Sequence, residues 1–248
     1  MIDFGTPSIA ETAADIRSKI TEAELLRENG HIKPSKILLS KQILRAAEIG
    51  NDELKASALA QQIINFKHLY QNTKEYFHLV EMQVLIAEGM DLELSNAQKA
   101  VFHLRKGDLQ TFNCNYDKAH FEYKTALKNT KSHTLEHAEY LCHFGESYIP
   151  LGEYDKARLC IRGALEAMKK VTEIRDWHRL VVESRMWGCY SKVCLHQFRI
   201  ILALKYAKKY WLMARELRDK HGKAQRLNQF YQQMPMGRFL RLILERGN

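Results

Sequence analysis

The stretch from Tyr140 to Leu165, YLCHFGESYIPLGEYDKARLCIRGAL, constrains the fold more than any other part of this chain. Its apolar residues recur at helical spacing on both sides of a break at Pro150 and Gly152. Proline removes a backbone donor, and glycine can take the positive φ that favours a helix end. We therefore predict two antiparallel helices whose backbones approach most closely at two small residues, Gly145 and Ala157.

This stretch resembles the tetratricopeptide repeat. In that repeat, helix A carries a large apolar residue, an apolar–Gly pair and a Tyr, and helix B follows a Gly-x-Tyr-x-x-Ala start. The residues that fit are Leu141, Phe144, Gly145, Tyr148, Gly152, Tyr154, Ala157, Ile161 and Ala164. The Trp common at the first position is Leu141 here, and the Pro that often ends the repeat is absent. Weaker copies begin their second helix at Tyr116 upstream and place Trp187-Gly188 downstream.

One such unit cannot bury its apolar face alone, so the rest of the chain is expected to supply neighbouring units. We predict an all-α fold, a right-handed superhelical stack of antiparallel helix pairs, as a single TPR-like α-solenoid domain over residues 1–248. The clearest repeats are expected over 96–130, 134–170 and 180–220, with a C-terminal capping helix over 223–246. Only 4 Pro and 12 Gly in 248 residues argue against a loop-rich β architecture.

Capping residues predict where helices begin and end in the first hundred residues. Ser8 with Glu11 forms a Ser-x-x-Glu capping box, and Ser95 with Gln98 forms a similar pair. Gly30 is a favourable C-terminal stop for the first helix. These early helices lack the Gly/Ala signature of the central repeat. We therefore predict helical hairpins that resemble the repeat in their helix–turn–helix arrangement but not in their sequence.

The family resemblance also implies a location for binding. In tetratricopeptide proteins, the helix A residues that do not pack on helix B line a concave groove that holds peptides or partner helices. Matched from the Gly of each unit, the groove residues are Leu104, Arg105, Asp108, Glu139, His143, Glu146, Arg185, Cys189 and Lys192. Such a groove would grade from acidic at Glu139 and Glu146 to basic at Arg185 and Lys192, and could orient a peptide. The alternative is that these positions are merely solvated and that partners use the convex side or the ends.

Positive charge is concentrated in the last third of the chain. The whole sequence has 38 Lys and Arg against 29 Asp and Glu, a net charge of +9, whereas residues 171–248 alone have 16 against 6, a net charge of +10. A basic patch is expected at Lys208, Lys209, Arg215, Arg218, Lys220, Lys223 and Arg226. It could be a solvated outer face, a dock for an acidic protein, or a nucleic-acid surface with interleaved aromatic residues. No known nucleic-acid motif accompanies it, so nucleic acid is the less favoured partner.

Motifs of catalysis are missing from the sequence. There is no GxxxxGK[ST], GxGxxG or GxSxG pattern. His133 and His137 are four apart, as in some zinc sites, but no third ligand is evident. Glu139 and Glu146 could in principle work as an acid–base pair, although groove residues need no catalysis. We predict a protein that is not an enzyme, with no catalytic residues, no metal and no cofactor.

The N-terminus and the cysteines indicate the compartment. No basic leader follows Met1, no apolar run approaches the roughly 20 residues of a membrane span, and 5 cysteines without paired spacing fit reduced thiols. We expect a cytoplasmic protein without a membrane partner.

These observations predict a non-catalytic adaptor or scaffold that binds a protein or peptide, which could be acidic, through the concave groove and the basic C-terminal third. One alternative is a nucleic-acid-associated adaptor that binds RNA or DNA through that third. Another is a peptide-sensing regulator similar to those of Gram-positive bacteria, which usually carry an N-terminal helix-turn-helix; none is obvious in residues 1–90. The oligomeric state is left open.

Overall fold

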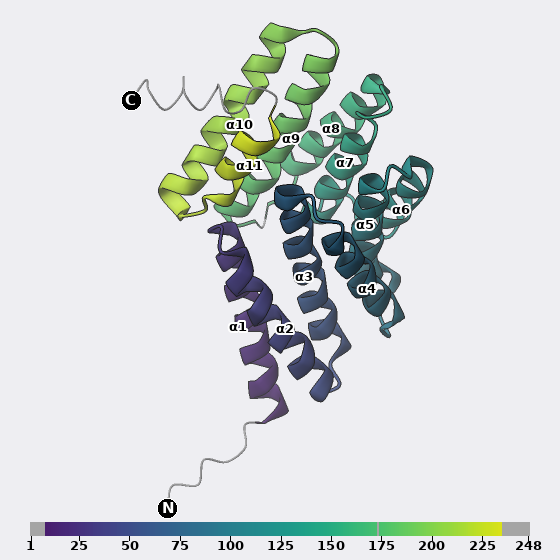
Figure 1. The fold of residues 1–248 in the computed structure, drawn as a ribbon, viewed down its shortest axis with the longest axis vertical. Helices are drawn as coiled ribbons and strands as arrows, with labels where there is room; N and C mark the ends of the chain where they lie inside the picture. The colour runs from purple at the N-terminus through teal and green to yellow at the C-terminus, as the bar shows by residue number, and fades with distance from the viewer. Residues whose placement is uncertain (1–7, 173, 235–248) are drawn as a thin grey trace, which may run out of the picture. The chain divides into compact units, whose positions relative to one another are not determined.

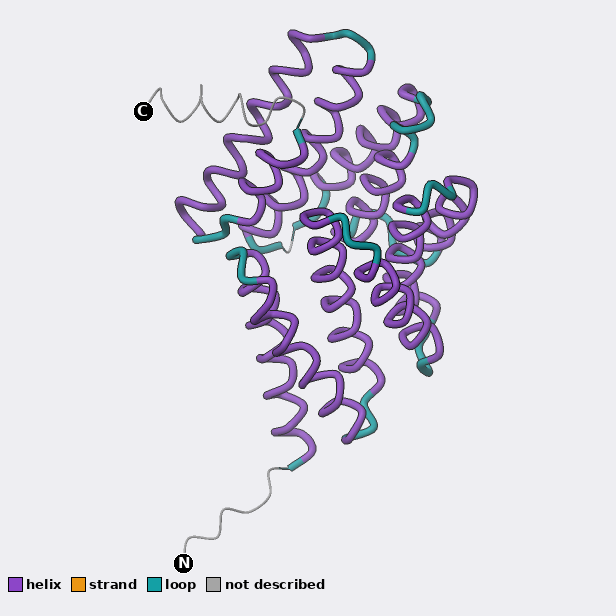
Figure 2. The backbone as a smooth tube through the Cα atoms, viewed as in Figure 1, coloured by secondary structure: helices purple, strands orange, loops and turns teal. Residues whose placement is uncertain are grey.

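The computed structural model describes residues 8–172 and 174–234, and these residues form eleven α-helices and no strand (Figures 1 and 2). The predicted all-α class is therefore confirmed. The helices are α1 (Ile9–Glu28), α2 (Ile32–Glu48), α3 (Asp52–Thr73), α4 (Phe77–Asp91), α5 (Asn96–Phe112), α6 (Tyr116–Lys128), α7 (Leu135–Ser147), α8 (Tyr154–Lys169), α9 (Asp176–His196), α10 (Ile200–His221) and α11 (Gln225–Gln233).

Contacts divide the chain into two compact units, an N-terminal unit of residues 1–105 and a C-terminal unit of residues 106–248. The boundary falls within α5. The predicted repeat ranges 96–130, 134–170 and 180–220 correspond to the pairs α5/α6, α7/α8 and α9/α10. A single domain over 1–248 and a superhelical stack stay predictions.

The capping signals in the N-terminal unit act as the sequence predicts. The backbone N–H of Glu11 donates to the Ser8 hydroxyl at 3.3 Å, and the Glu11 carboxylate accepts from the Ser8 backbone N–H at 2.8 Å. Ser95 and Gln98 exchange the same two bonds at 3.0 and 3.3 Å. Gly30 follows the end of α1 with a φ of +91°. Each bond satisfies a backbone group that a helix end would otherwise leave unpaired.

Apolar residues from the first three helices form the core of the N-terminal unit. Helix α1 packs on α2 and α3, α2 packs on α3, and α3 packs on α4. Helix α3 therefore has α2 on one side and α4 on the other. The core residues shared by α1, α2 and α3 are Ile16, Ile20, Ala23, Leu39, Ala46, Leu54 and Ala58.

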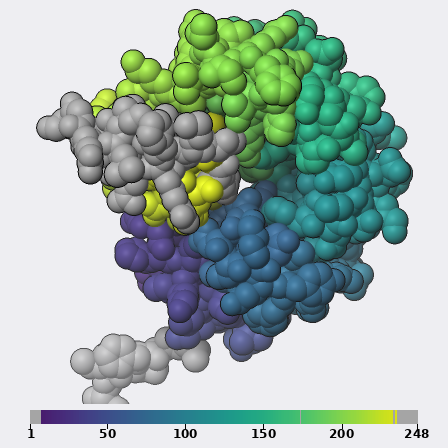
Figure 3. Space-filling view, turned by 45° about the horizontal axis from the view of Figure 1, so that its top comes forward, coloured from purple at the N-terminus to yellow at the C-terminus, as the bar shows by residue number. Residues whose placement is uncertain are grey.

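Glycines on one helix of each pair set the close packing of the C-terminal unit. A Cβ on Gly145 would lie 3.0 Å from Ile161 and 3.1 Å from the carbonyl oxygen of Ala157, so the predicted close approach of Gly145 and Ala157 is confirmed. Other glycines face tyrosines of the next helix in the same way: Gly107 faces Tyr123, and Gly188 faces Tyr210. The side chains of neighbouring helices in this unit lie against one another in the space-filling view (Figure 3).

The turn at Gly152 is also confirmed. Helix α7 ends at Ser147 and α8 begins at Tyr154. Gly152 has a φ of +72°, and its N–H donates to the Ile149 carbonyl at 3.1 Å. A residue with a Cβ would be strained in this left-handed conformation.

Helix α11 packs on α9 and α10 in the C-terminal unit and buries Leu227 and Phe230. It accounts for Gln225–Gln233 of the predicted capping helix over 223–246, and residues 235–246 lie outside the described residues. Within the described ranges, no helix is long and apolar enough to cross a membrane.

Candidate binding sites

Several of the predicted groove residues in the C-terminal unit come together where α7 contacts α9. The Glu146 carboxylate on α7 accepts hydrogen bonds from two α9 side chains, Arg185 at 2.7 Å and Lys192 at 3.0 Å. From the sequence, these acidic and basic residues are expected at opposite ends of a charge gradient. In the structure they form ion pairs, so Glu146 is neutralised within the predicted groove.

A buried histidine extends this cluster toward α5 and α6. The His143 ring lies with Nδ1 2.5 Å from the Asp108 carboxylate and Nε2 2.6 Å from the Arg185 guanidinium. The Tyr123 hydroxyl donates to the same carboxylate at 3.0 Å. A guanidinium can only donate, so Nε2 accepts and Nδ1–H donates to Asp108, which is the arrangement of a neutral imidazole. We call Asp108, Tyr123, His143, Glu146, Arg185 and Lys192 the α7–α9 polar network.

Burial and the charges of the network shift the pKa values of several of its side chains. Burial by itself would raise the pKa of Glu146, but Lys192 and Arg185 together hold that pKa well below its usual range. The charge of Glu146 in turn raises the pKa of Lys192. Burial and the nearby Asp108 carboxylate raise the pKa of Tyr123 well above its usual value. Glu146 is thus ionised at neutral pH and does not hold the proton that a general acid must donate.

The other predicted groove residues are half-buried or buried. Glu139 lies with a carboxylate oxygen 3.5 Å from His143 Nε2. Cys189 is buried with its sulfur 4.0 Å from that of Cys142. The contact with Cys142, together with burial, raises the pKa of the Cys189 thiol well above its usual value, so this thiol is protonated and a weak nucleophile. Two more groove residues, Leu104 and Arg105, belong to the N-terminal unit and are buried on α5.

Most residues of the predicted basic patch have partners within the chain. Arg215 and Arg218 both pair with Asp219, at 3.3 and 2.7 Å, and Lys220 pairs with Glu216 at 2.7 Å. Lys209 lies 4.0 Å from the centre of the Trp187 ring and Lys223 lies 4.3 Å from that of Trp177, while Arg226 donates to Gln229 at 2.8 Å and Lys208 is exposed.

The aromatic residues among these cations mostly belong to the core. Tyr210, Trp211 and Phe230 are buried where α10 packs on α11. Tyr206 is half-buried and stacks on Trp187, with ring centres 5.4 Å apart. A base-stacking platform needs exposed ring faces, and the three core rings do not offer them.

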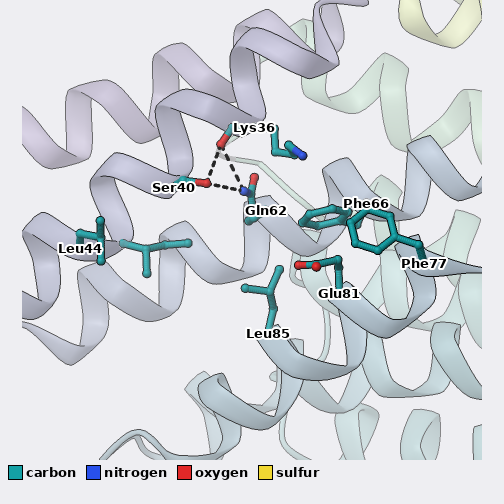
Figure 4. A pocket seen from close by; sticks show the side chains of 9 residues that line it. Lys36, Ser40, Leu44, Gln62, Phe66, Phe77, Glu81 and Leu85 are labelled. Atoms are coloured by element: carbon teal, nitrogen blue, oxygen red, sulfur yellow. Dashed lines mark hydrogen bonds between the residues drawn. The ribbon is translucent and has the colours of Figure 1, made fainter.

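A second candidate site lies in the N-terminal unit, at residues that the sequence pattern did not indicate. Here α2 and α4 form the walls of a groove of about 360 Å³, and α3 forms its floor (Figure 4). We call it the α2–α4 groove. The lining residues are Lys36, Ser40, Ile43, Leu44, Gln62, Phe66, Phe77, Glu81 and Leu85.

The floor of the α2–α4 groove is well ordered by internal bonds. The Gln62 amide donates to the Lys36 carbonyl at 3.1 Å and to the Ser40 hydroxyl at 3.0 Å (Figure 4). The Phe66 and Phe77 rings meet edge to face, 6.5 Å apart. Polar groups on the floor therefore have partners before any ligand arrives, and a ligand would meet a mainly apolar surface.

Both walls of the groove expose large apolar side chains. Of the lining residues, Leu44 on α2 is 65% exposed and Phe77 on α4 is 54% exposed. Val84, beside the lining on α4, is 58% exposed. Ile37 and Val80, which lie on the same faces of these helices at helical spacing, are also exposed. A sequence signal existed, because α4, FHLVEMQVLIAEGMD, has apolar residues on every side of the helix with a few polar ones among them. A helix of that kind is either fully buried or has a further partner, and the structure buries only part of its surface.

In comparisons with known proteins, no family model matches the chain, and no curated protein matches it. The class is defined by the structure alone, as an all-helical protein in which consecutive helices pack on one another.

Proposed function

We propose that this chain is a non-catalytic, TPR-like helical-repeat adaptor that binds a protein partner, and that the α2–α4 groove is a main binding surface. The observation that carries the proposal is the exposure of Leu44 and Phe77, which line the groove from its two walls, with exposed Val84 beside the lining on α4. Contiguous exposed apolar surface around a groove is typical of interaction sites. Covering it gains about 25 cal/mol for each Å² of apolar surface removed from water.

The repeat-like packing supports the same function. Gly107, Gly145 and Gly188 each face a residue of the following helix, as small residues do in a repeated helix pair. Repeat stacks bury their core between units and leave extended surfaces for partners. A right-handed superhelix and membership of the tetratricopeptide class are parts of this proposal.

The α7–α9 polar network suits a structural role within the adaptor. Its charges already have partners, so a ligand carboxylate at Arg185 or Lys192 would have to compete with Glu146. Replacing both cations with Glu would gather three carboxylates at one place and alter stability together with any binding. That double replacement is therefore a poor test of binding, and the groove in the N-terminal unit provides a better one.

The test places a photo-crosslinking amino acid at Val84, which is exposed on α4 next to the groove-lining Leu85. The matched control position is Leu159 in the C-terminal unit, which is 60% exposed. Each variant is irradiated in native lysate. We expect a protein adduct from position 84 that Leu44→Glu removes, and no such adduct from position 159. Equal labelling at both positions would contradict the proposed function.

The nucleic-acid alternative gives a different outcome in the same lysate. If RNA or DNA is the partner, adducts depend on nucleic acid and disappear after nuclease treatment, and affinity falls steeply with salt because phosphate contacts release counterions. A peptide-sensing regulator would instead bind a short peptide in the absence of any macromolecule.

A further inference from the structure

We infer that the occupant of the α2–α4 groove is one amphipathic α-helix, with an acidic flank along α2 and a basic flank along α4. The inference rests on the proposed function, because it specifies the partner of the same groove. Four observations support it: the direction of the walls, the length of the groove, the pairing of the backbone groups within the wall helices, and the charges on each wall.

The two walls run in the same direction. Helix α3 packs between α2 and α4 and is joined to each by a short connection, so both neighbours run antiparallel to it. Lys36 and Phe77 accordingly lie at one end of the groove, while Leu44 lies toward the other (Figure 4). The groove therefore lies above α3 with one helix on each side.

The length of the groove suits two to three helical turns. Lys36 and Leu44, which line the α2 wall, are eight residues apart, or about 12 Å at 1.5 Å per residue. A helix of that length presents apolar side chains at positions i, i+3 or i+4, and i+7. The α4 residues that line the groove, Phe77, Glu81 and Leu85, also recur at helical spacing, four residues apart.

An extended peptide fits this surface less well than a helix. The walls are helices, whose interior backbone groups already pair within each helix. An extended peptide would lay its N–H and C=O groups on Leu44, Phe77 and Leu85 without partners, and burying unpaired polar groups is costly. A helix satisfies its own backbone, so only side chains need to match the groove.

Charge on the two walls is opposite in sign. Helix α2 carries four cations and one anion, at Lys33, Lys36, Lys41, Arg45 and Glu48, whereas α4 carries Glu81, Glu88 and Asp91 and no Lys or Arg. Some are engaged: Arg45 pairs with Asp15, and Glu88 pairs with Lys55.

Lys36 and Glu81 lie within the groove lining itself. Lys36 holds its ammonium 5.1 Å from the centre of the Phe66 ring. A helix between the walls would present its flanks to opposite charges, as the charged flanks of a coiled coil do.

The test uses two synthetic 18-residue peptides of identical composition, each with Leu along one face. In the segregated peptide, one flank carries only Glu and the other only Lys; in the mixed peptide, each flank alternates Glu and Lys. Binding to the full chain is measured by fluorescence anisotropy at low salt. We expect the segregated peptide to bind about fivefold more tightly, because only it can match both walls at once.

Variants of the chain then locate the effect. The exchange Lys36→Glu with Glu81→Lys mixes the charges on each wall and should bring the affinities of the two peptides to within twofold of each other. The matched control, Glu153→Lys with Lys156→Glu, exchanges an exposed ion pair in the C-terminal unit and should preserve the preference. Leu44→Glu should weaken both peptides at least tenfold.

Other outcomes would overturn the inference in distinguishable ways. Equal affinity of both peptides for the unaltered chain would refute the charge selection. Binding of neither peptide, while position 84 still captures a protein, would refute the helical ligand but leave the proposed function standing. Failure of both experiments would refute both. Self-association in sedimentation that Leu44→Glu abolishes would show instead that a second copy of this chain occupies the groove.

Discussion

Some non-glycine residues of this protein have left-handed backbone conformations, which are unfavourable for a residue with a Cβ. Phe198, just after α9, has a φ of +57° and is 89% exposed. Its N–H donates to the Leu195 carbonyl at 3.0 Å, and the Arg199 N–H donates to the Cys194 carbonyl at 2.8 Å. These two bonds define a helix end at which glycine is the favoured residue, and an aromatic residue pays a steric cost there.

We predict that Phe198→Gly stabilises the chain by about 0.5–1 kcal/mol, since relief of the left-handed strain exceeds the added entropy of the unfolded chain. Because the Phe198 ring is exposed, removing it costs little buried apolar surface. Urea unfolding followed by circular dichroism measures the change. The reciprocal control is Gly222→Ala, at a φ of +66° with no atom within 4 Å of an added Cβ, which should destabilise by about 1 kcal/mol. Loss of stability in Phe198→Gly would show that the ring makes contacts in solution.

Glu146 makes stability depend on acid pH. Its pKa is lower in the folded chain than its ordinary value of 4.5 because Lys192 and Arg185 outweigh the effect of burial. Its contribution is therefore fully present above about pH 4.5 and is lost as the pH falls toward the folded-state pKa. We predict that Glu146→Gln costs about 2 kcal/mol at pH 7, less than a fully buried pair would because 29% of the side chain is exposed.

A series of urea unfolding curves from pH 7 to pH 3 checks this prediction. The free energy of unfolding should fall more steeply below pH 4.5 in the unaltered chain than in Glu146→Gln, so that the two curves converge. Parallel curves across the series would mean that Glu146 is not the group responsible.

At the scale of the elements, a glycine on one helix of a pair lets the two helices pack closely, because it has no side chain between them. Gly145 brings α7 against α8, and its nearest neighbours include the backbone carbonyl of Ala157, which cannot move away like the end of a flexible side chain. Gly163 on α8 is different, because an added Cβ would meet only Leu141, at 3.7 Å. Replacing each of the two glycines with alanine therefore distinguishes the effect of close packing on stability from the effect of helix propensity.

We predict that Gly145→Ala destabilises the chain by about 1 kcal/mol, because overpacking outweighs the gain in helix propensity. The matched control Gly163→Ala should instead stabilise it by about 0.5–1 kcal/mol, as alanine generally does in a helix interior with room for a methyl group. Thermal unfolding of both variants gives the signs directly. If both variants gained stability, α7 and α8 would not approach as closely in solution.

At the scale of the whole molecule, the two compact units predict uneven stability along the chain. Contacts concentrate within residues 1–105 and within residues 106–248, and repeat proteins depend mainly on contacts between neighbours. A core change in one unit should therefore affect that unit first.

We predict that Leu39→Ala, at a fully buried position of the N-terminal core, lowers the local stability of α1 to α3 by about 3 kcal/mol and changes α9 and α10 much less. Native-state hydrogen exchange with mass spectrometry measures each helix separately. A uniform loss of protection in all helices would show that the chain unfolds as one cooperative unit.

The sequence by itself determined the features that depend on a few neighbouring residues. The capping box at Ser8, the left-handed turn at Gly152 and the small residues at Gly145 and Ala157 are recognisable because their causes lie within a helical hairpin. An all-α class follows from such local signals repeated along the chain. Local backbone geometry needs no knowledge of distant partners.

Only the tertiary structure decided how charges and apolar faces find partners. Glu146 meets Arg185 and Lys192, 39 and 46 residues away, so a predicted charge gradient became a set of ion pairs. The α2–α4 groove exists because α3 covers only part of the apolar surface of α4. Spacing along a chain shows that a face is apolar or charged, but the packing of whole helices determines whether that face is covered, and by what.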